Sequence, residues 1–107
     1  MSIADDAKSA VHGSRHEVYG HPLQDFQRIA ELWAVVLNIN VTPKQVGLCM
    51  IALKLAREVY KHQRDTLVDI AGYAECLQMI EEKLQEPVAP PPFVHNRENT
   101  LCCSGVE

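Results

Sequence analysis

The segment from residue 43 to residue 62 constrains the fold more than any other part of the chain. It begins with the strongest helix-start signal present: Thr42 can cap the helix, Pro43 suits the first helical position, and Gln45 completes a capping box. Apolar residues then recur on more than one side of the helix: Val46, Leu48, Met50, Ile51, Leu53, Leu55 and Val59. A helix this apolar is typically enclosed by others, so we expect it at the centre of a helical bundle.

Three further segments have helical patterns. The first runs from about Ile3 to Tyr19 and has a weak apolar stripe that Gly13 interrupts. The next runs from about Leu23 or Asp25 to Leu37 and carries a clear amphipathic stripe: Phe26, Ile29, Ala30, Trp33, Val36 and Leu37. The last runs from about Asp65 to Gln85. Because no strand pattern or internal repeat is present, the sequence predicts an all-α fold, a bundle of four helices.

The composition changes at Pro87. The run Pro87-Val88-Ala89-Pro90-Pro91-Pro92 cannot continue a helix and favours polyproline II, and the residues that follow to Glu107 show no periodicity. We therefore expect a helical domain over residues 1–86 and a disordered, proline-rich tail over residues 87–107. A domain this small with so apolar a helix also favours self-association, so we expect a homo-oligomer.

Charge and hydropathy limit the classes of function. The 107 residues carry a formal net charge of −4, whereas a protein that binds duplex nucleic acid through its phosphates is usually basic, so duplex binding is disfavoured. The apolar stretch from Val46 to Leu55 is too short to cross a bilayer, and the acidic N-terminus lacks the features of a signal peptide. We therefore expect a cytoplasmic protein without a membrane partner. A small phosphorylated ligand is compatible with this charge, because a local group of lysines and arginines can hold it.

The four cysteines show no zinc-site spacing. Cys49 and Cys76 lie within apolar helical patterns, so we expect them to be reduced residues of the core. Cys102 and Cys103 are adjacent in the polar tail, where an exposed pair is expected.

Asp65 and Asp69 are one helical turn apart on the last helix and therefore share one face of it. Two carboxylates at this separation repel unless a cation or a proton lies between them. In one interpretation they hold Mg²⁺, which prefers oxygen ligands, with Glu31 as a third ligand. In the other interpretation they are structural: Asp65 caps its helix, and Asp69 pairs with Lys54 or Arg57. The residues leave both interpretations open.

Cations and aromatic residues provide candidates for ligand binding. Lys54 and Arg57 are three residues apart on the apolar helix, where they can bind a phosphate or stabilise the bundle. Arg15 precedes Tyr19 by one turn at the end of the first helix, which places a cation and an aromatic ring where a pocket can open. Tyr73 follows the two aspartates and offers a hydroxyl group or a stacking ring.

Four stretches together resemble a known family: Arg15…Tyr19-Gly20, Phe26…Ile29-Ala30-Glu31-Leu32-Trp33, Met50…Lys54-Leu55-Ala56-Arg57 and Asp65…Asp69-Ile70-Ala71-Gly72-Tyr73. The pattern resembles a family of small bacteriophage and prophage proteins of uncharacterised function. It is more distantly similar to the MazG-like nucleoside triphosphate pyrophosphohydrolases and to phage nucleotide-modification-associated domains. The resemblance covers the chain from about Ala10 to Leu77.

The MazG-like resemblance implies an all-α protein that binds Mg²⁺ through acidic residues on two helices. Such a protein cleaves a nucleoside triphosphate to the monophosphate and pyrophosphate. By this resemblance Asp69 matches the last acid of the second metal motif, and Asp65 lies beside it as a catalytic residue. The first motif, Glu-x-x-Glu, has no counterpart here, and Glu31 is the only nearby candidate.

Three functions are compatible with these residues. The first is a phage-encoded, Mg²⁺-dependent nucleotide pyrophosphohydrolase of the host cytoplasm. In it the two aspartates hold the metal, the two cations of the apolar helix neutralise the phosphates, and the arginine and tyrosines contact the base or sugar. The second is a non-catalytic helical module that binds a nucleotide or a host protein. The third is an oligomerising structural domain.

Overall fold

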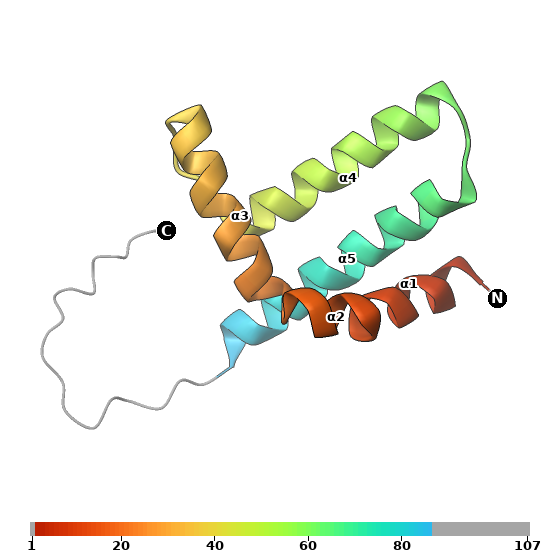
Figure 1. Cartoon of the computed structure of the whole chain (residues 1–107), viewed down its shortest axis with the longest axis horizontal. Coiled ribbons are helices and arrows are strands. Elements are labelled where there is room, and N and C mark those ends of the chain that lie inside the picture. Colours follow the sequence, from red (N-terminus) through yellow and green to blue (C-terminus); the bar gives the residue numbers. More distant parts are fainter. Residues whose placement is uncertain (1, 87–107) are drawn as a thin grey trace, which may run out of the picture.

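The computed structural model describes residues 2–86, and all regular structure in this range is helical. Five helices follow one another: α1 (Ile3–His12), α2 (Ser14–Tyr19), α3 (Pro22–Leu37), α4 (Pro43–Tyr60) and α5 (Arg64–Gln85) (Figure 1). The predicted all-α fold is confirmed. All four predicted helical segments are present, and the first of them is divided into α1 and α2. The tail predicted over residues 87–107 lies outside the described residues.

Two glycines shape the path from α1 to α3. At Gly13, where α1 ends and α2 begins, a Cβ atom would lie 2.5 Å from the carbonyl oxygen of Ser9, so the backbone can take this path only without a side chain. Gly20 ends α2 with a φ of +80°, in the region of backbone conformation that favours glycine. The chain therefore turns at both ends of the short helix α2.

Side-chain caps start α3 and α4. Nδ1 of His21 accepts a hydrogen bond from the amide of Leu23 at 3.0 Å, and Pro22 occupies the first turn of α3. At α4, the Thr42 hydroxyl accepts from the amide of Gln45 at 3.1 Å, and Oε1 of Gln45 accepts from the amide of Thr42 at 2.9 Å. The predicted capping box is thus confirmed.

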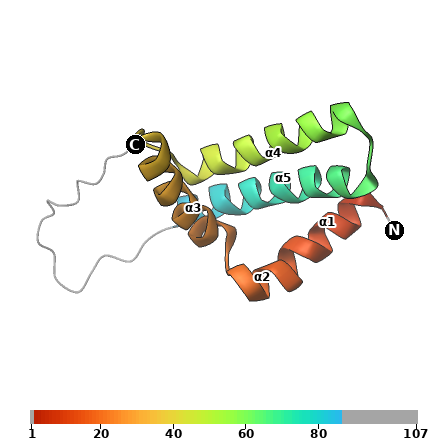
Figure 2. The same ribbon diagram turned by 45° about the horizontal axis from the view of Figure 1, so that its top comes forward.

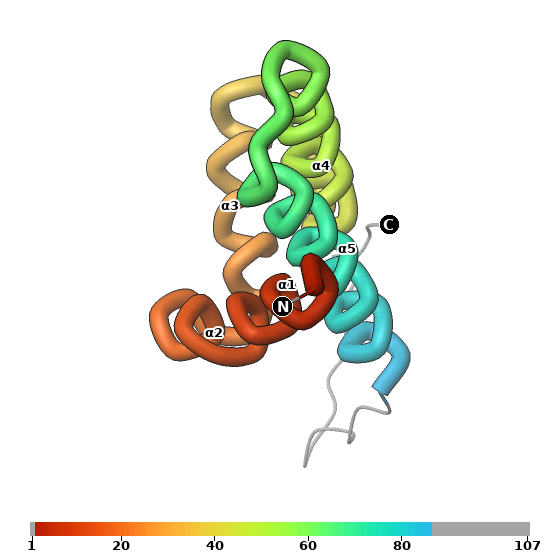
Figure 3. Tube along the Cα trace, turned by 90° about the vertical axis from the view of Figure 1, so that its right-hand side faces the viewer, coloured from red at the N-terminus to blue at the C-terminus, as the bar shows by residue number. Residues whose placement is uncertain are grey.

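The central helix is α5. It packs against α1, α3 and α4, and α1 and α4 lie on opposite sides of it (Figures 1 and 2). Helices α4 and α5 form an antiparallel hairpin, and in Figure 3 α3 and α4 rise side by side above α1 and α2. The prediction that the helix from residue 43 is central is wrong, because among the described helices α4 packs only against α3 and α5.

The core lies where α3, α4 and α5 meet. Phe26, Ala30, Val46 and Ile80 are buried there, and partly buried residues pack around them: Leu23, Ile29, Trp33, Val41, Met50, Tyr73 and Cys76. Ala7 and Val11 are buried on α1, which packs against α5. The predicted stripes of α1 and α3 are therefore confirmed near Val11 and Phe26, whereas Val36 and Leu37 at the end of α3 are exposed.

Two polar contacts set the position of α1 along α5. Nη1 of Arg64 lies 2.6 Å from Oδ2 of Asp6, and Nε2 of His12 lies 2.7 Å from Oε2 of Glu75. Because these side chains are partly exposed, each contact adds little to the free energy of unfolding. Both contacts agree with a parallel arrangement of α1 and α5.

The outer side of α4 is apolar and exposed. Leu48, Leu53, Leu55 and Val59 are all exposed, and so is Cys49, which the sequence predicted to lie in the core. The prediction for Cys49 is wrong because the described part of the chain has no helix that covers this side of α4. Within residues 2–86, no helix combines the length and apolarity needed to cross a membrane.

Candidate functional site

A cleft opens between α2 and α5, bordered by the end of α1 and the start of α3. Its cavity volume is about 50 Å³, so most of the space beside its lining is open to solvent. We call it the aromatic cleft because Tyr19, Phe26 and Tyr73 line it. Four of the predicted site residues meet in this lining: Arg15, Tyr19, Asp69 and Tyr73.

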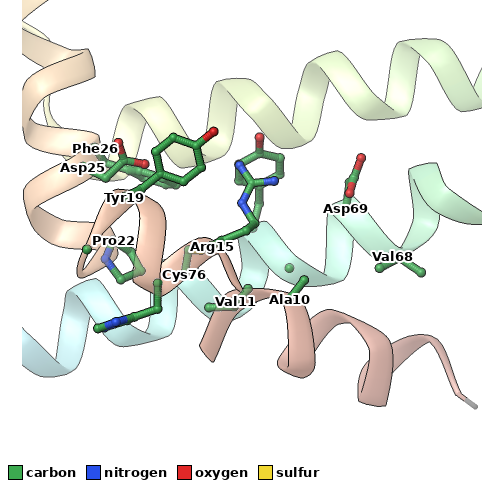
Figure 4. A pocket seen from close by; sticks show the side chains of 14 residues that line it. Ala10, Val11, Arg15, Tyr19, Pro22, Asp25, Phe26, Val68, Asp69 and Cys76 are labelled. Atoms are coloured by element: carbon green, nitrogen blue, oxygen red, sulfur yellow. The ribbon is translucent and has the colours of Figure 1, made fainter. Parts of the chain in front are cut away.

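Arg15 is the cation of the aromatic cleft. Its Cζ lies 5.5 Å from the centre of the Tyr19 ring, a cation–π contact between residues one turn apart on α2. Figure 4 shows the Arg15 side chain extending between Tyr19 and Asp69. Arg15 forms no ion pair within the described residues 2–86, so its charge is available to an anionic ligand.

Phe26 and Tyr73 form an aromatic wall. Their ring centres are 6.2 Å apart and the ring planes are tilted by 46°. Phe26 comes from α3, whose start is fixed by the His21 cap, and Tyr73 comes from the central helix α5. Val11 of α1 and Pro22 of α3 extend this wall with apolar surface. Because Val11, Pro22 and Phe26 are buried, Tyr73 is the residue of this wall that a ligand can contact.

Arg28 joins α3 to the end of α2. Its Nη2 donates a hydrogen bond to the carbonyl oxygen of Tyr19 at 3.0 Å and lies 3.7 Å from Oδ1 of Asp25. The contact satisfies a carbonyl group left open at the end of α2 and so holds Tyr19 at the cleft. Asp25 also lines the aromatic cleft but was not a predicted site residue. An acidic residue in the first turn of a helix is common for reasons of helix stability alone.

Two histidines lie where α2 meets α3. Their rings, those of His16 and His21, are in edge-to-face contact at 6.2 Å, and His16 lines the aromatic cleft without having been predicted there. Burial lowers the pKa of His21, and the nearby positive charges of Lys83 and His16 lower it further, against the opposing effect of Glu86. The lowered pKa favours the neutral ring, whose Nδ1 can accept the capping hydrogen bond.

A second cleft lies between the C-terminal half of α4 and the start of α5. We call it the cationic cleft because Lys54, Arg57 and Lys61 line it. Asp65 and Asp69 line it from α5. Asp69 belongs to the lining of both clefts, so the two adjoin at this residue.

Lys54 and Asp69 form an ion pair across the α4–α5 contact. Nζ of Lys54 lies 2.9 Å from Oδ2 of Asp69, and the two side chains are 18% and 39% exposed. This pair is the one that the structural interpretation of Asp69 predicts. Asp65 is exposed in the first turn of α5, and Gln63 occupies the capping position instead. The predicted cap by Asp65 is therefore wrong, although its charge suits the helix dipole.

The three predicted metal ligands do not form one group. Glu31 lies on α3, accepts a hydrogen bond from Nε2 of Gln27 at 3.1 Å, and lines neither cleft. In the described part of the chain, no three His, Cys, Asp or Glu side chains are placed to hold a metal ion. Two carboxylates, one of them held by Lys54, fit Mg²⁺ poorly. Magnesium binding by Asp65 and Asp69 stays a prediction.

Cys76 contributes a neutral thiol to the aromatic cleft. Burial raises its pKa to about 11, although the charge of Arg15 acts in the opposite direction. The thiol is therefore protonated near neutral pH and is not an activated nucleophile. The structure agrees with the prediction that Cys76 is a packed, reduced residue.

A protein-family model described as a domain of unknown function, DUF6378, matches residues 2–81 of the chain. The chain belongs to this family. Its relatives include the gene 55 protein of Mycobacterium phage D29, which is 38% identical over 92 residues, 85% of this chain and 59% of the relative. The gene 55 protein of Mycobacterium phage L5 is 42% identical over 89 residues, 81% of this chain and 54% of the relative.

The DUF6378 chain therefore spans somewhat more than half the length of these relatives. The predicted relationship to bacteriophage proteins is confirmed. No solved structure matches the chain. The finer similarity to MazG-like pyrophosphohydrolases stays a prediction.

Proposed function

We propose that this domain binds a nucleotide across the two adjoining clefts, with the base in the aromatic cleft and the phosphates directed to the cationic cleft. The observation that carries the proposal is the meeting of Arg15, Tyr19 and Tyr73 in one lining. These residues come from α2 and α5, so only the fold brings them together.

The side chains that line the aromatic cleft suit a base and sugar. Tyr19 and Tyr73 offer ring faces and edges on which a planar base can stack. Arg15, which forms no ion pair within residues 2–86, supplies a planar cation for a phosphate or a base carbonyl group. Asp25 adds a hydrogen-bond acceptor for an exocyclic amino group or a sugar hydroxyl.

The cationic cleft suits phosphates. Lys54, Arg57 and Lys61 gather three positive charges beside the point where the two clefts adjoin. In this proposal Asp69 positions Lys54 through their ion pair, and Lys54 has two further donors for a phosphate oxygen. The carboxylate of Asp65 offsets part of this positive charge. The cleft therefore favours a ligand with few phosphate groups over one with many.

We place binding ahead of hydrolysis for two reasons. The Asp69 carboxylate is engaged by Lys54, so it is not free to activate water. Among residues 2–86, Cys76 is the one cysteine that lines the aromatic cleft, and its thiol is protonated. Neither residue offers the activated group that phosphoryl chemistry requires.

The second candidate function is the Mg²⁺-dependent pyrophosphohydrolase activity that the MazG-like resemblance implies. One observation favours it: Asp65 and Asp69 both line the cationic cleft beside Arg57, where acids and a phosphate-binding cation would be needed.

Thermal unfolding with a panel of nucleosides and of deoxynucleoside mono-, di- and triphosphates tests the proposal. A ligand that binds only the folded state raises the melting temperature, so at least one nucleotide should do so more than its nucleoside. The same mixtures with MgCl₂ are assayed for pyrophosphate. Stabilisation without pyrophosphate release supports the binding module, and release supports the second candidate. A panel without any stabilisation contradicts the proposal.

A further inference from the structure

The outward side of α4 is apolar along its length. Two neighbouring rows of side chains make up this α4 face: Leu48, Ala52, Leu55 and Val59 in one, and Cys49, Leu53, Ala56 and Tyr60 in the other. All eight residues are exposed, and Val59 and Tyr60 are 87% and 90% exposed. Figure 1 shows α4 at the edge of the described domain, with no other helix on its outer side.

The first row has the spacing of helices that pair along their length. Leu48 and Leu55 are seven residues apart, as are Ala52 and Val59, which is the a and d pattern of a coiled coil. In an antiparallel pair related by a two-fold axis, Ala52 faces Leu55 of the partner subunit, so the smallest residue of the row meets a large one. We propose that a second copy of this chain covers the α4 face through antiparallel pairing of α4 with α4.

The exposed area agrees with a dimer. The α4 face presents on the order of 600 Å² per copy, at the lower end of the ~600–1,000 Å² that each partner contributes to a stable interface. Thirteen large apolar residues are exposed in the described domain, whereas only four are buried: Val11, Phe26, Val46 and Ile80. The two rows of the α4 face carry no charged residue. They therefore complement the same apolar rows of a second copy better than the charged surface of another protein.

The same face borders the candidate site. Leu53, Ala56 and Tyr60 of the second row also line the cationic cleft. A partner subunit on the α4 face would therefore lie at the edge of this cleft and narrow its mouth. The dimer does not depend on the proposed function, because its assembly is measured without a ligand.

Sedimentation velocity on the full chain tests the dimer. A dimer with a Kd of about 10 μM is mostly assembled at a chain concentration of about 100 μM. At that concentration the expected mass is therefore twice 12.0 kDa. Leu55→Glu should give a monomer with unchanged helical circular dichroism, whereas Leu84→Glu, a matched change at an exposed leucine of α5, should stay dimeric. If Leu55→Glu loses helicity, Val59→Glu replaces it. A monomeric wild type, or a dimer that these α4 variants leave intact, overturns the inference.

Mixing two variants tests the antiparallel register. Ala52→Lys and Leu55→Glu should each be monomeric alone, because each places charges against apolar side chains of the partner subunit. Their equimolar mixture should form a dimer, because the new ammonium then faces the new carboxylate at one end while native Leu55 and Ala52 meet at the other. A mixture that stays monomeric overturns the antiparallel arrangement.

Discussion

The ammonium group of Lys54 lies 2.9 Å from the carboxylate of Asp69, the residue at which the aromatic and cationic clefts adjoin. The pair thus links α4 to α5 at the centre of the candidate site. It directs Lys54 along the cationic cleft and neutralises Asp69. One contact therefore serves both the packing of the helices and the charge balance of the site.

This ion pair should respond unequally to the loss of either partner. Asp69→Asn leaves the Lys54 side chain, which is only 18% exposed, without a counter-ion. It should lower the free energy of unfolding by about 1–2 kcal/mol, a cost between those of losing an exposed and a buried ion pair. Lys54→Met leaves a carboxylate that water reaches and should cost less than about 1 kcal/mol. Urea unfolding measures both. Lys83→Met, which breaks the exposed pair with Glu86, is the control and should change stability by no more than about 0.5 kcal/mol. Equal costs at Lys54 and Asp69 would contradict this account.

His21 should make stability depend on pH. Its pKa in the folded protein is below the usual value of about 6.5, so the neutral cap is fully favourable above that pH and is lost as pH falls through the lowered pKa. The melting temperature of the wild type should therefore fall between pH 7 and pH 5 by more than that of His21→Asn. Asparagine caps a helix without titrating in this range.

The described domain also contains the His12–Glu75 and His62–Glu58 contacts. They are present in the wild type and in His21→Asn alike, so the difference between the two proteins isolates the cap. A wild type and a His21→Asn variant with parallel pH profiles would show that the cap does not titrate as described.

Two helical glycines should respond oppositely to alanine. A Cβ atom at Gly47 would lie 2.5 Å from Cδ2 of Leu77 and 3.2 Å from Cε2 of Phe26 in the core. Overpacking costs about 1–3 kcal/mol and should outweigh the gain in helix propensity. At Gly72 the nearest atom is Cγ2 of Val11 at 3.5 Å, an ordinary contact, so Gly72→Ala should stabilise the fold by up to about 1 kcal/mol.

Gly72 also lines the aromatic cleft, so Gly72→Ala should weaken ligand binding while raising the melting temperature. Thermal unfolding and a ligand titration on the same variant check both effects. A variant that is more stable and binds as the wild type does would indicate that the ligand lies away from Gly72.

The two helical cysteines should differ in reactivity. Cys49 is exposed, whereas Cys76 is partly buried with a pKa of about 11. Iodoacetamide reacts with the thiolate, so at pH 8, and at a protein concentration low enough to keep the chain monomeric, Cys49 should be modified well before Cys76. Peptide mapping by mass spectrometry measures both rates, and unfolding in urea should remove the difference. Equal rates in the folded protein would contradict the burial of Cys76.

Local signals in the sequence predicted the helices well. The capping box at Thr42 and the turn at Gly20 involve only neighbouring residues, so they can be identified without knowing the fold. The position of α4 could not be predicted in this way. Its apolarity indicated a buried helix, but the described domain has no element that covers Leu55 and Val59.

The candidate site was predicted residue by residue but not as two clefts. Arg15 and Tyr19 were found because they are one turn apart, yet their meeting with Tyr73 depends on how α1 lies along α5. Asp25 could not be recognised from the sequence, because an acidic residue in the first turn of a helix is common for reasons of helix stability. Glu31 is the only nearby sequence candidate for the first metal motif, but its place in the middle of α3 leaves it outside both clefts.

Calorimetric titration of nucleotides into wild type and Arg15→Gln tests the central claim most directly. At least one deoxynucleotide should bind the wild type with a micromolar Kd, and Arg15→Gln should weaken that binding by about 10-fold or more, or about 1.4 kcal/mol. Lys8→Gln, the same loss of charge on the exposed side of α1 and outside the cleft lining, should bind as the wild type does. Absence of binding to every nucleotide at millimolar concentration, or equal affinity in Arg15→Gln, would contradict a nucleotide site in the aromatic cleft.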